Sequence, residues 1–332
     1  MRFIKKLLFV LVLLTIFLGG ITSLGVASDE FSEIVQNANQ GNAEAQLSLS
    51  VIYYLGEKTP KDYKKALTWA TKSAEQGDAQ AQYNLALIYS LGNGTPKDYK
   101  KVIYWITKSA EQGYAPAQFE LGTLYNYGEK IPKDYKKAFT WYSKSAEQGN
   151  AKAQFNLAVM YSSGKGIPKD IKKAFTWTIK SAEQGYAKAQ YNLAIMYSSG
   201  KGIPKDLKKA LTWATKSAEQ GDAQAQYNLA IMYHFGKGIP KDYKKAFTWY
   251  FKSAEQGYAR AQFNLSLMYE LGEGAPKDYK KAYAWYSIAQ ANGEKKAVNL
   301  LSELESKMTS QQISEAQVEA GKLWKKINSK DN

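Results

Sequence analysis

Apolar residues recur with a helical period in short segments that glycine and proline separate. In residues 77–112, Ala81, Leu85 and Tyr89 are four residues apart, a spacing that places them on one face of an α-helix. A second segment follows, whose apolar residues are Val102, Trp105 and Ile106. The alternation of apolar and polar residues that is typical of strands is absent. The pattern therefore predicts two helices.

The residues that flank these segments are typical of helix ends. Asp78 and Asp98 precede the two segments, and we expect them to cap the free N–H groups of each first turn. Gly92 follows the first segment, where a left-handed glycine commonly ends a helix. Pro96 then prevents the helix from continuing. The unit is therefore a helix–turn–helix.

The same unit is repeated along most of the chain. Tryptophan recurs every 36 residues at Trp69, Trp105, Trp141, Trp177, Trp213, Trp249 and Trp285. Seven units follow one another without insertion, at residues 41–76, 77–112, 113–148, 149–184, 185–220, 221–256 and 257–292. A helix pair cannot bury its apolar face alone, so the pairs must stack. The predicted fold class is all-α, an α/α superhelical solenoid of 36-residue helix–turn–helix repeats with helical caps.

Capping segments are expected at both ends of this array. Residues 28–40 align with the end of a second helix and predict an N-terminal capping helix. Residues 293–332 lose the repeat pattern and predict C-terminal capping helices, the first over about 294–307. Terminal segments with a polar outer face keep a solenoid soluble.

The last helix carries its own start signal. Thr309-Ser310-Gln311-Gln312 has the spacing of a capping box, and the helix that it begins is expected to end near Lys326. We expect Trp324 to dock this helix on the stack, because it is the one large aromatic residue there.

Composition excludes several kinds of site. The chain has no cysteine and one histidine among 332 residues, which excludes a disulfide framework, a cysteine nucleophile and cysteine-ligated zinc. The net charge is +15, from 45 lysine and arginine residues against 30 acidic residues. Only Arg2 and Arg260 are arginine, although nucleic-acid readers prefer the bidentate arginine fork. We expect no nucleic-acid partner.

The first residues form a targeting segment. Basic residues precede the apolar run 7–18, and the small residues of Gly25-Val26-Ala27-Ser28 follow it. This order predicts a signal peptide over residues 1–27, cleaved after Ala27 or Ser28, and an exported chain that is periplasmic or secreted. The alternative is an uncleaved membrane anchor, because the run and the residues after it approach a span of about 20 residues.

The sequence of one unit is distinctive. It runs Ala81-Gln82-Tyr83-Asn84-Leu85-Ala86-Leu87-Ile88-Tyr89, Gly92-Asn93-Gly94, Asp98-Tyr99-Lys100-Lys101 and Trp105, and closes on Ala110-Glu111-Gln112-Gly113. It resembles the Sel1-like repeat, a bacterial-rich relative of the tetratricopeptide repeat. The resemblance implies a non-catalytic adaptor that holds a protein or peptide on its concave face, in envelope or host-interaction processes. It implies no cofactor and no small-molecule substrate.

Two columns of residues are candidates for partner binding on that face. The polar column consists of Asn84, Glu120, Asn156, Asn192, Asn228 and Asn264. In tetratricopeptide-like proteins this position can present carboxamides to an extended peptide, and an amide offers both a donor and an acceptor to a main chain. The alternative is that these residues cap or bridge adjacent helices.

The aromatic column precedes the polar column by one residue. It consists of Tyr83, Phe119, Phe155, Tyr191, Tyr227 and Phe263. Such rings supply large, rigid contact area for a partner, or they belong to the core. The third unit departs most from its sisters, through Glu120 among other residues. It is either a specificity patch or the product of drift.

Lysine marks a second surface. Each unit contributes lysines at the positions of Lys97, Lys100, Lys101 and Lys108, the last of which is replaced by Ile288 in the seventh unit, and pairs such as Asp98 with Lys101 offset part of the charge. The stripe is either a solvated face or an attractor of anionic polysaccharide, a membrane surface or an acidic partner. A binder of anionic envelope or host glycans is therefore the alternative function.

Catalysis has little support in this sequence. His234 is the sole histidine, and no recurring acid or nucleophile accompanies it as a relay or a metal site would require. We expect it at the surface or at a helix end, with no catalytic, metal or cofactor site in the chain. A cell-wall-directed enzyme remains a remote alternative.

Overall fold

The chain is helical throughout the part that the structure describes. The computed structural model describes residues 27–329, which form helices joined by turns, with no strand among them. The predicted all-α fold class is therefore confirmed. The predicted signal peptide, residues 1–27, lies outside the described residues except for Ala27. The chain divides into two compact units, Met1–Lys169 and Asp170–Asn332.

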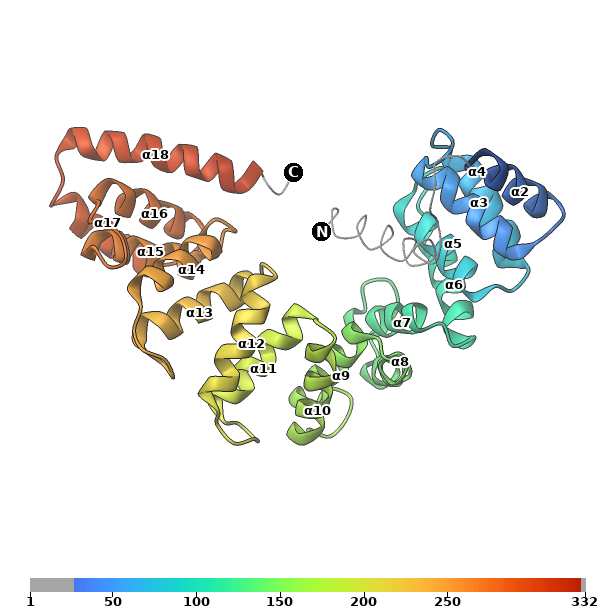
Figure 1. The fold of residues 1–332 in the computed structure, drawn as a ribbon, viewed down its shortest axis with the longest axis horizontal. Coiled ribbons are helices and arrows are strands. Elements are labelled where there is room, and N and C mark those ends of the chain that lie inside the picture. The colour runs from blue at the N-terminus through green and yellow to red at the C-terminus, as the bar shows by residue number, and fades with distance from the viewer. Residues whose placement is uncertain (1–26, 330–332) are drawn as a thin grey trace. The chain divides into compact units, whose positions relative to one another are not determined.

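The first unit stacks helix pairs. In the three complete repeats of this unit the first helix packs against the second helix of its own repeat, and each first helix after the first also packs against the second helix of the repeat before it (Figure 1). At the start, α2 packs on α3 and takes the place of a preceding second helix. The helices are α2 (Ala27–Asn39), α3 (Ala43–Leu55), α4 (Tyr63–Glu75), α5 (Ala79–Leu91), α6 (Tyr99–Glu111), α7 (Ala115–Tyr127), α8 (Tyr135–Glu147) and α9 (Ala151–Ser163).

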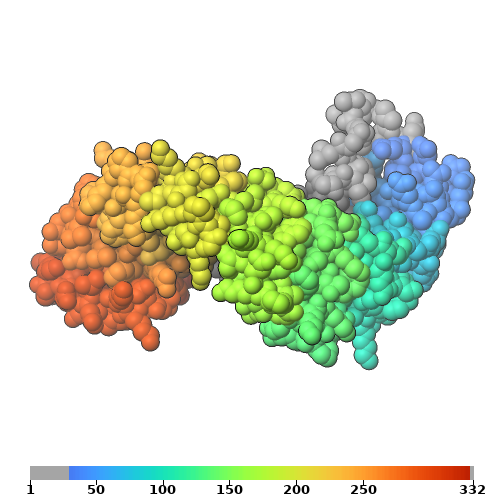
Figure 2. All heavy atoms as spheres, turned by 90° about the horizontal axis from the view of Figure 1, so that it is seen from below, coloured from blue at the N-terminus to red at the C-terminus, as the bar shows by residue number. Residues whose placement is uncertain are grey.

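The second unit continues the same alternation and adds two capping helices. Its repeat helices are α10 (Ile171–Glu183), α11 (Ala187–Ser199), α12 (Leu207–Glu219), α13 (Ala223–Phe235), α14 (Tyr243–Ala254), α15 (Ala259–Leu271) and α16 (Tyr279–Ala291). The capping helices α17 (Lys296–Glu305) and α18 (Ser310–Asn328) both pack on α16. In the space-filling view the repeats of each unit form successive bands of colour, each seated against the next (Figure 2).

Caps define the ends of these helices as the sequence predicts. Asp98 accepts a hydrogen bond from the backbone N–H of Lys101 at 3.1 Å and begins α6. Gly92 ends α5 in the left-handed conformation, with φ 75°. The capping box is also present, since Thr309 and Gln312 each bond the other's backbone at the start of α18. The other aspartates that cap second helices are Asp62, Asp134, Asp170, Asp206, Asp242 and Asp278.

The second glycine of the turn permits a close approach between neighbouring repeats. Gly94 has φ 77°, and a Cβ atom there would lie 2.5 Å from the carbonyl oxygen of Tyr63 in the preceding repeat. No side chain fits that gap without a shift of the backbone. The turn of one repeat is thereby seated on the start of the previous repeat's second helix.

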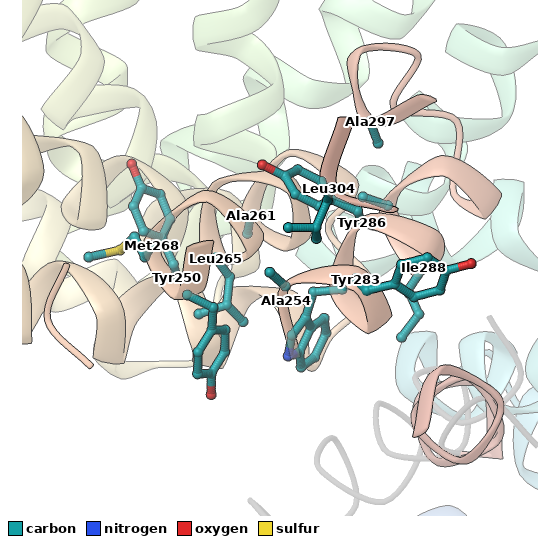
Figure 3. Close-up of a cluster of buried hydrophobic side chains, with 14 of the residues drawn as sticks. Tyr250, Ala254, Ala261, Leu265, Met268, Tyr283, Tyr286, Ile288, Ala297 and Leu304 are labelled. Carbon is teal, nitrogen blue, oxygen red and sulfur yellow. The ribbon is translucent and has the colours of Figure 1, made fainter. Parts of the chain in front are cut away.

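The core is built from small and large residues that alternate between facing helices. In the second unit, Ala254, Ala261 and Leu265 are fully buried beside the large side chains of Tyr250 and Tyr286 (Figure 3). Alanine at these positions lets neighbouring helices approach closely, and the rings fill the space that remains. The core extends without interruption into the C-terminal cap.

A buried polar column joins one repeat to the next. Gln226 donates from Nε2 to the carbonyl oxygen of Ala218, on the second helix of the preceding repeat, at 3.1 Å. Its Oε1 accepts from Gln256 of its own repeat at 2.8 Å. The equivalent donors to the preceding repeat are Gln46, Gln82, Gln118, Gln154, Gln190 and Gln262. Each of these carbonyls lies in the last turn of a helix and also accepts from the backbone N–H of the glycine three positions later, as Ala218 does from Gly221 at 3.0 Å.

Buried serines fix the angle within each pair. Ser253 donates to the carbonyl oxygen of Ala223 at 2.7 Å, which ties the end of α14 to the start of α13. The same bond forms at Ser73, Ser109, Ser145 and Ser217. Both bonds end on main-chain carbonyls, so they fix the backbones of neighbouring helices relative to one another.

The C-terminal cap covers a surface that inner repeats expose. Elsewhere the residue three positions after tryptophan is lysine, but in the seventh repeat it is Ile288, which is 2 % exposed. Trp285 is likewise 2 % exposed. The change from lysine to isoleucine therefore marks where the cap packs.

The expected role of Trp324 is wrong. Its side chain is 38 % exposed, whereas Ala316 and Ile327 are buried and Ile313 and Leu323 pack against the core. These four residues follow a helical spacing that faces α16, and position 324 falls beside that stripe. Small and aliphatic residues therefore dock α18.

We expect Gln226→Leu to lower the free energy of unfolding by about 1–3 kcal/mol, because it removes the side-chain bond to the Ala218 carbonyl and the acceptor of the Gln256 amide. The exposed Gln224 lies on the same helix, so Gln224→Leu is the matched control and should change stability by less than about 0.5 kcal/mol. Urea unfolding followed by circular dichroism measures both. Equal losses would show that the polar column does not stabilise the stack.

Candidate protein-binding surface

The first helices present one face to solvent in each unit. On α11, Lys188, Ile195 and Ser199 are exposed, and the half-buried Tyr191 and Asn192 lie on the same side. Their spacing is that of a single helix face. We call this surface, formed by α3, α5, α7 and α9 in one unit and by α11, α13 and α15 in the other, the first-helix face. Both predicted columns lie on these helices.

The polar column bridges adjacent first helices at several positions. Asn228 on α13 donates from Nδ2 to the hydroxyl of Tyr191 on α11 at 2.8 Å. The amide of Asn264 interacts with the hydroxyl of Tyr227 and so opposes the rise in that tyrosine's pKa that burial causes. The structure therefore brings a member of the polar column beside the aromatic residue of the preceding repeat. Contact with a partner stays a prediction.

Asn84 differs from the other amides because it is only 2 % exposed. Within the described residues, neither atom of its amide group has a hydrogen-bond partner. The sequence explains this, since Leu47 takes the place that Tyr191 holds beside Asn228 and offers no hydroxyl. At this position the column adds a buried polar group, not an accessible one.

Glu120 and Lys152 lie close enough to interact across consecutive first helices. Burial lowers the pKa of the Lys152 ammonium group, and the negative charge of Glu120 opposes that effect. Glu120 is half-buried. The one acidic member of the polar column thus attracts a lysine of the next repeat, which gives the third repeat a local charge pattern of its own.

The aromatic column is half-buried, with one exception. Tyr83 is 4 % exposed, and its ring packs against Tyr114 with centroids 5.5 Å apart. Tyr227 packs in the same way on Tyr258, at 5.1 Å. The half-buried members are Phe119, Phe155, Tyr191, Tyr227 and Phe263. Each such ring has one side in the core and an edge toward the surface.

Two cavities open between consecutive first helices at equivalent positions. One lies between α5 and α7, has a volume of about 230 Å³, and is lined by Tyr83 and Glu120 among others. The other lies between α11 and α13, has a volume of about 660 Å³, and is lined by Tyr191 and Asn228. The lining residues are 108 positions apart, which is three repeats. Both predicted columns therefore meet at these cavities.

The floor of each cavity explains the difference in volume. In the larger cavity the second helix contributes Ala210 and Ala214, whereas in the smaller one it contributes Val102 and Ile106. The longer side chains occupy space that alanine leaves open. The position shared by Ala214 and Ile106 was not among the predicted site residues, although its variation between small and large side chains is visible in the repeats.

Tyrosines fill the corresponding space in other repeats, and their burial raises the pKa of their hydroxyl groups. Tyr142 is 1 % exposed, and burial raises its pKa to about 12 although the hydroxyl of Thr123 lies 3.1 Å from its own. Burial also raises the pKa of Tyr250 and of Tyr286. These phenols are neutral over the whole physiological pH range.

The lysine stripe is largely engaged by its own repeats. Lys180 places its ammonium group 4.4 Å from the centre of the Trp177 ring, and Lys216 does so over Trp213. Lys209 lies over Tyr197 at 5.4 Å. Such contacts cover the outer face of half-buried rings, so the lysines help to shield apolar surface. Tryptophans such as Trp105 and Trp213 pack against buried core residues.

His234 is partly buried. Its side chain is 17 % exposed, its Nε2 lies 3.2 Å from a carboxylate oxygen of Glu273, and its ring stacks on Phe235. The expected helix-end position is confirmed, since His234 lies in the last turn of α13, where aromatic neighbours cover its ring. No group of three or more metal-ligating side chains occurs in residues 27–329. Among the same residues, no helix combines the length and the apolar character that a membrane span needs.

The chain belongs to the Sel1 repeat family. Matches to the Sel1 repeat cover residues 43–78, 79–114, 115–150, 151–186, 187–222, 223–258 and 259–293. Each match begins two residues after the corresponding unit set by the sequence pattern. Sel1 repeat proteins are typically protein-interaction scaffolds, and the fold is generally non-catalytic.

The chain is similar to several solved structures, of which one shows the same architecture. A Sel1 repeat protein from Oxalobacter formigenes is 35% identical over 85% of this chain and 82% of its own, with a TM-score of 0.69. A protective antigen of uropathogenic Escherichia coli with an SLR fold is 29% identical over 91% and 88%, with a TM-score of 0.38. An immunity protein from Pseudomonas aeruginosa is 23% identical over 65% and 83%, with a TM-score of 0.42. The last two superpose too weakly to inform on function.

None of the curated proteins matches this sequence. The partner must therefore be sought through the chemistry of the first-helix face.

The raised pKa of Tyr142 predicts a loss of stability in alkali. An unfolded tyrosine ionises near pH 10, whereas the folded one resists ionisation until about pH 12. Its contribution is complete below pH 10 and is lost as the pH rises toward 12. We expect Tyr142→Phe to show a smaller fall in Tm between pH 9 and pH 11 than the parent chain.

Tyr104 is the control, because its ring is 51 % exposed. Tyr104→Phe should leave the pH dependence of Tm unchanged in differential scanning calorimetry. If both variants follow the parent curve, burial of the Tyr142 phenol contributes nothing to alkaline unfolding.

Proposed function

We propose that this chain is an exported, non-catalytic scaffold that holds a polypeptide partner against the first-helix face. The observation that carries the proposal is the pair of equivalent cavities between consecutive first helices, where the polar and aromatic columns meet. Cavities with a mostly apolar wall and a few polar groups are the usual form of a binding site. Membership of a family of interaction scaffolds agrees with it.

The arrangement suits an extended chain better than a compact ligand. Amide groups such as those of Asn192 and Asn228 recur at a fixed interval of one repeat, and each can donate to and accept from a peptide main chain. The rings beside them offer rigid contact area with little loss of side-chain entropy. Main-chain recognition by the amides leaves specificity to the cavities.

Export rests on the N-terminal segment. A basic start, the apolar run 7–18 and the small residues before Ser28 support a signal peptide that is removed after Ala27 or Ser28. The proposed site of action is the envelope or the host interface. The engagement of lysines by their own tryptophans favours a protein partner over an anionic glycan.

A site-specific photo-crosslinker tests this proposal in the producing cell. We expect a crosslinker at Ile195, which is exposed on the first-helix face, to trap a discrete polypeptide that mass spectrometry identifies. The same group at Thr212, which is exposed on a second helix, should trap none. Equal adducts from both positions, or none from Ile195, would contradict binding at the first-helix face.

With that polypeptide purified, we expect Asn192→Ala to weaken its binding by roughly 2–10-fold, because one hydrogen bond contributes about 0.5–1.5 kcal/mol. Glu120→Ala should instead change which polypeptides bind, since Glu120 sets the charge pattern of the third repeat. Asn299→Ala on α17, exposed outside the first-helix face, is the control for calorimetric titration. Affinities that stay unchanged in both variants would rule out the polar column as a binding element.

A further inference from the structure

One position on the second helix decides whether the space between two first helices is filled. In the third, sixth and seventh repeats this position is tyrosine, and each ring is at most 1 % exposed. In the fifth repeat it is Ala214, which lies on the floor of the cavity of about 660 Å³. The three tyrosines are Tyr142, Tyr250 and Tyr286.

The surroundings of Tyr142 show what this space accepts. Its ring centre lies 5.9 Å from that of Phe119, and its hydroxyl lies 3.1 Å from the Thr123 hydroxyl and interacts with the amide of Asn156. Glycine at position 122 of α7 leaves room for the ring, because a Cβ atom there would lie 2.8 Å from the Tyr142 ring. Two repeats later, the residues equivalent to Phe119, Gly122, Thr123 and Asn156 are Tyr191, Ala194, Ile195 and Asn228.

All four of those equivalents line the cavity above Ala214. The ring packing recurs at the other two tyrosines, although the hydroxyl of Tyr286 donates to Glu270 instead. Tyr250 packs on Tyr227 with centroids 5.8 Å apart, and Tyr286 packs on Phe263 at the same distance. The cavity is therefore a socket for an aromatic ring that three sister repeats supply themselves and the fifth repeat lacks.

The direction of entry sets which ring fits. The chain's own tyrosines rise from the second helix, so the Tyr142 hydroxyl reaches the level of Thr123 and Asn156 on the first helices. A ring that enters from the first-helix face arrives in the opposite sense, with its tip against Ala210 and Ala214. A hydroxyl there would have no hydrogen-bond partner on an alanine floor, which favours phenylalanine over tyrosine.

The charge around the socket indicates which kind of residue would lie next to the inserted ring in a bound peptide. Lys205 and Lys237 contribute to the lining, and none of the described residues that line the socket is acidic. A carboxylate beside the inserted ring would have two lysines of the lining near it and no acidic lining residue to repel it. Asn228, which donates one amide hydrogen to Tyr191, retains a second one for the main chain of a bound peptide.

We propose that the socket above Ala214 binds a phenylalanine side chain of a polypeptide partner, with an acidic residue next to that phenylalanine near Lys205 and Lys237. This assignment rests on the proposed function and gives the scaffold a point of side-chain specificity. The sequence of the fifth repeat, not its backbone, creates the site.

Three acetylated and amidated peptides test the proposal on the full chain. They are Gly-Asp-Phe-Asp-Gly and the same peptide with tyrosine or alanine at the centre, titrated by calorimetry and followed by methyl NMR of Met232, which lines the socket. We expect the phenylalanine peptide to bind at least tenfold more tightly than the alanine peptide and at least threefold more tightly than the tyrosine peptide. It should also shift the Met232 methyl signal.

Ala214→Tyr fills the socket in the manner of Tyr250, which packs with Ala230 at the position equivalent to Ala194, and should reduce binding of the phenylalanine peptide at least tenfold without a fall in Tm. Thr212→Tyr places the same residue at an exposed position of the same second helix, outside the socket, and should leave binding unchanged. Ile195→Glu, at an exposed position of the rim, is a second blocking variant that leaves the floor intact. It should repel the acidic peptide and weaken binding at least tenfold.

The assignment is overturned if the phenylalanine peptide shows no saturable binding, if the alanine peptide binds equally well, or if the two blocking variants bind as the parent does. Tighter binding of the tyrosine peptide would overturn the alanine-floor orientation. A polypeptide that is still trapped at Ile195 and binds Ala214→Tyr with the affinity of the parent would refute the socket alone. Failure to trap any polypeptide would instead refute the scaffold.

Discussion

The stack depends on a main-chain carbonyl in the last turn of each second helix that precedes another repeat, because this carbonyl accepts a hydrogen bond from the next repeat in addition to one from its own chain. A buried glutamine from the next repeat donates that bond, as Gln226 does for Ala218. Because the partner is backbone, the bond fixes where the next helix pair lies but makes little demand on the neighbouring side chains. The interval of 36 residues then carries the same bond along the chain.

Most of the fold could be predicted from the sequence, because its signals are local. Aspartate caps, left-handed glycines and the capping box at Thr309 each act within one turn of helix, and all occupy the expected places. Such local signals do not predict which residues of α18 pack against the rest of the fold. Trp324 is the largest apolar residue of that helix, but the stripe that includes Ala316 and Ile327 faces the core. The burial of a side chain is set by its helical phase relative to a distant surface, not by its size alone.

The candidate site was predictable only as a set of columns. The recurrence of asparagine after an aromatic residue places both on the first helices, and the structure brings them together across consecutive repeats, as with Asn228 and Tyr191. What the columns do not reveal is the floor between them. Residues 36 positions apart in sequence meet there together with a residue of the intervening second helix, so the cavity above Ala214 depends on three helices at once. The glutamine and serine columns recur as regularly as tryptophan, yet periodicity by itself does not distinguish a buried polar bond from a solvated one.

Backbone-directed bonds between units of uniform length have an evolutionary consequence. One whole unit could be lost or duplicated through unequal recombination, and every buried glutamine would still find an alanine carbonyl to bond. Every turn glycine would likewise still pack on the second helix of the preceding repeat. The number and order of sockets could therefore change in a single genetic step without a mismatch in the scaffold. Only the seventh unit is not interchangeable, because Ile288 in place of lysine commits it to the cap.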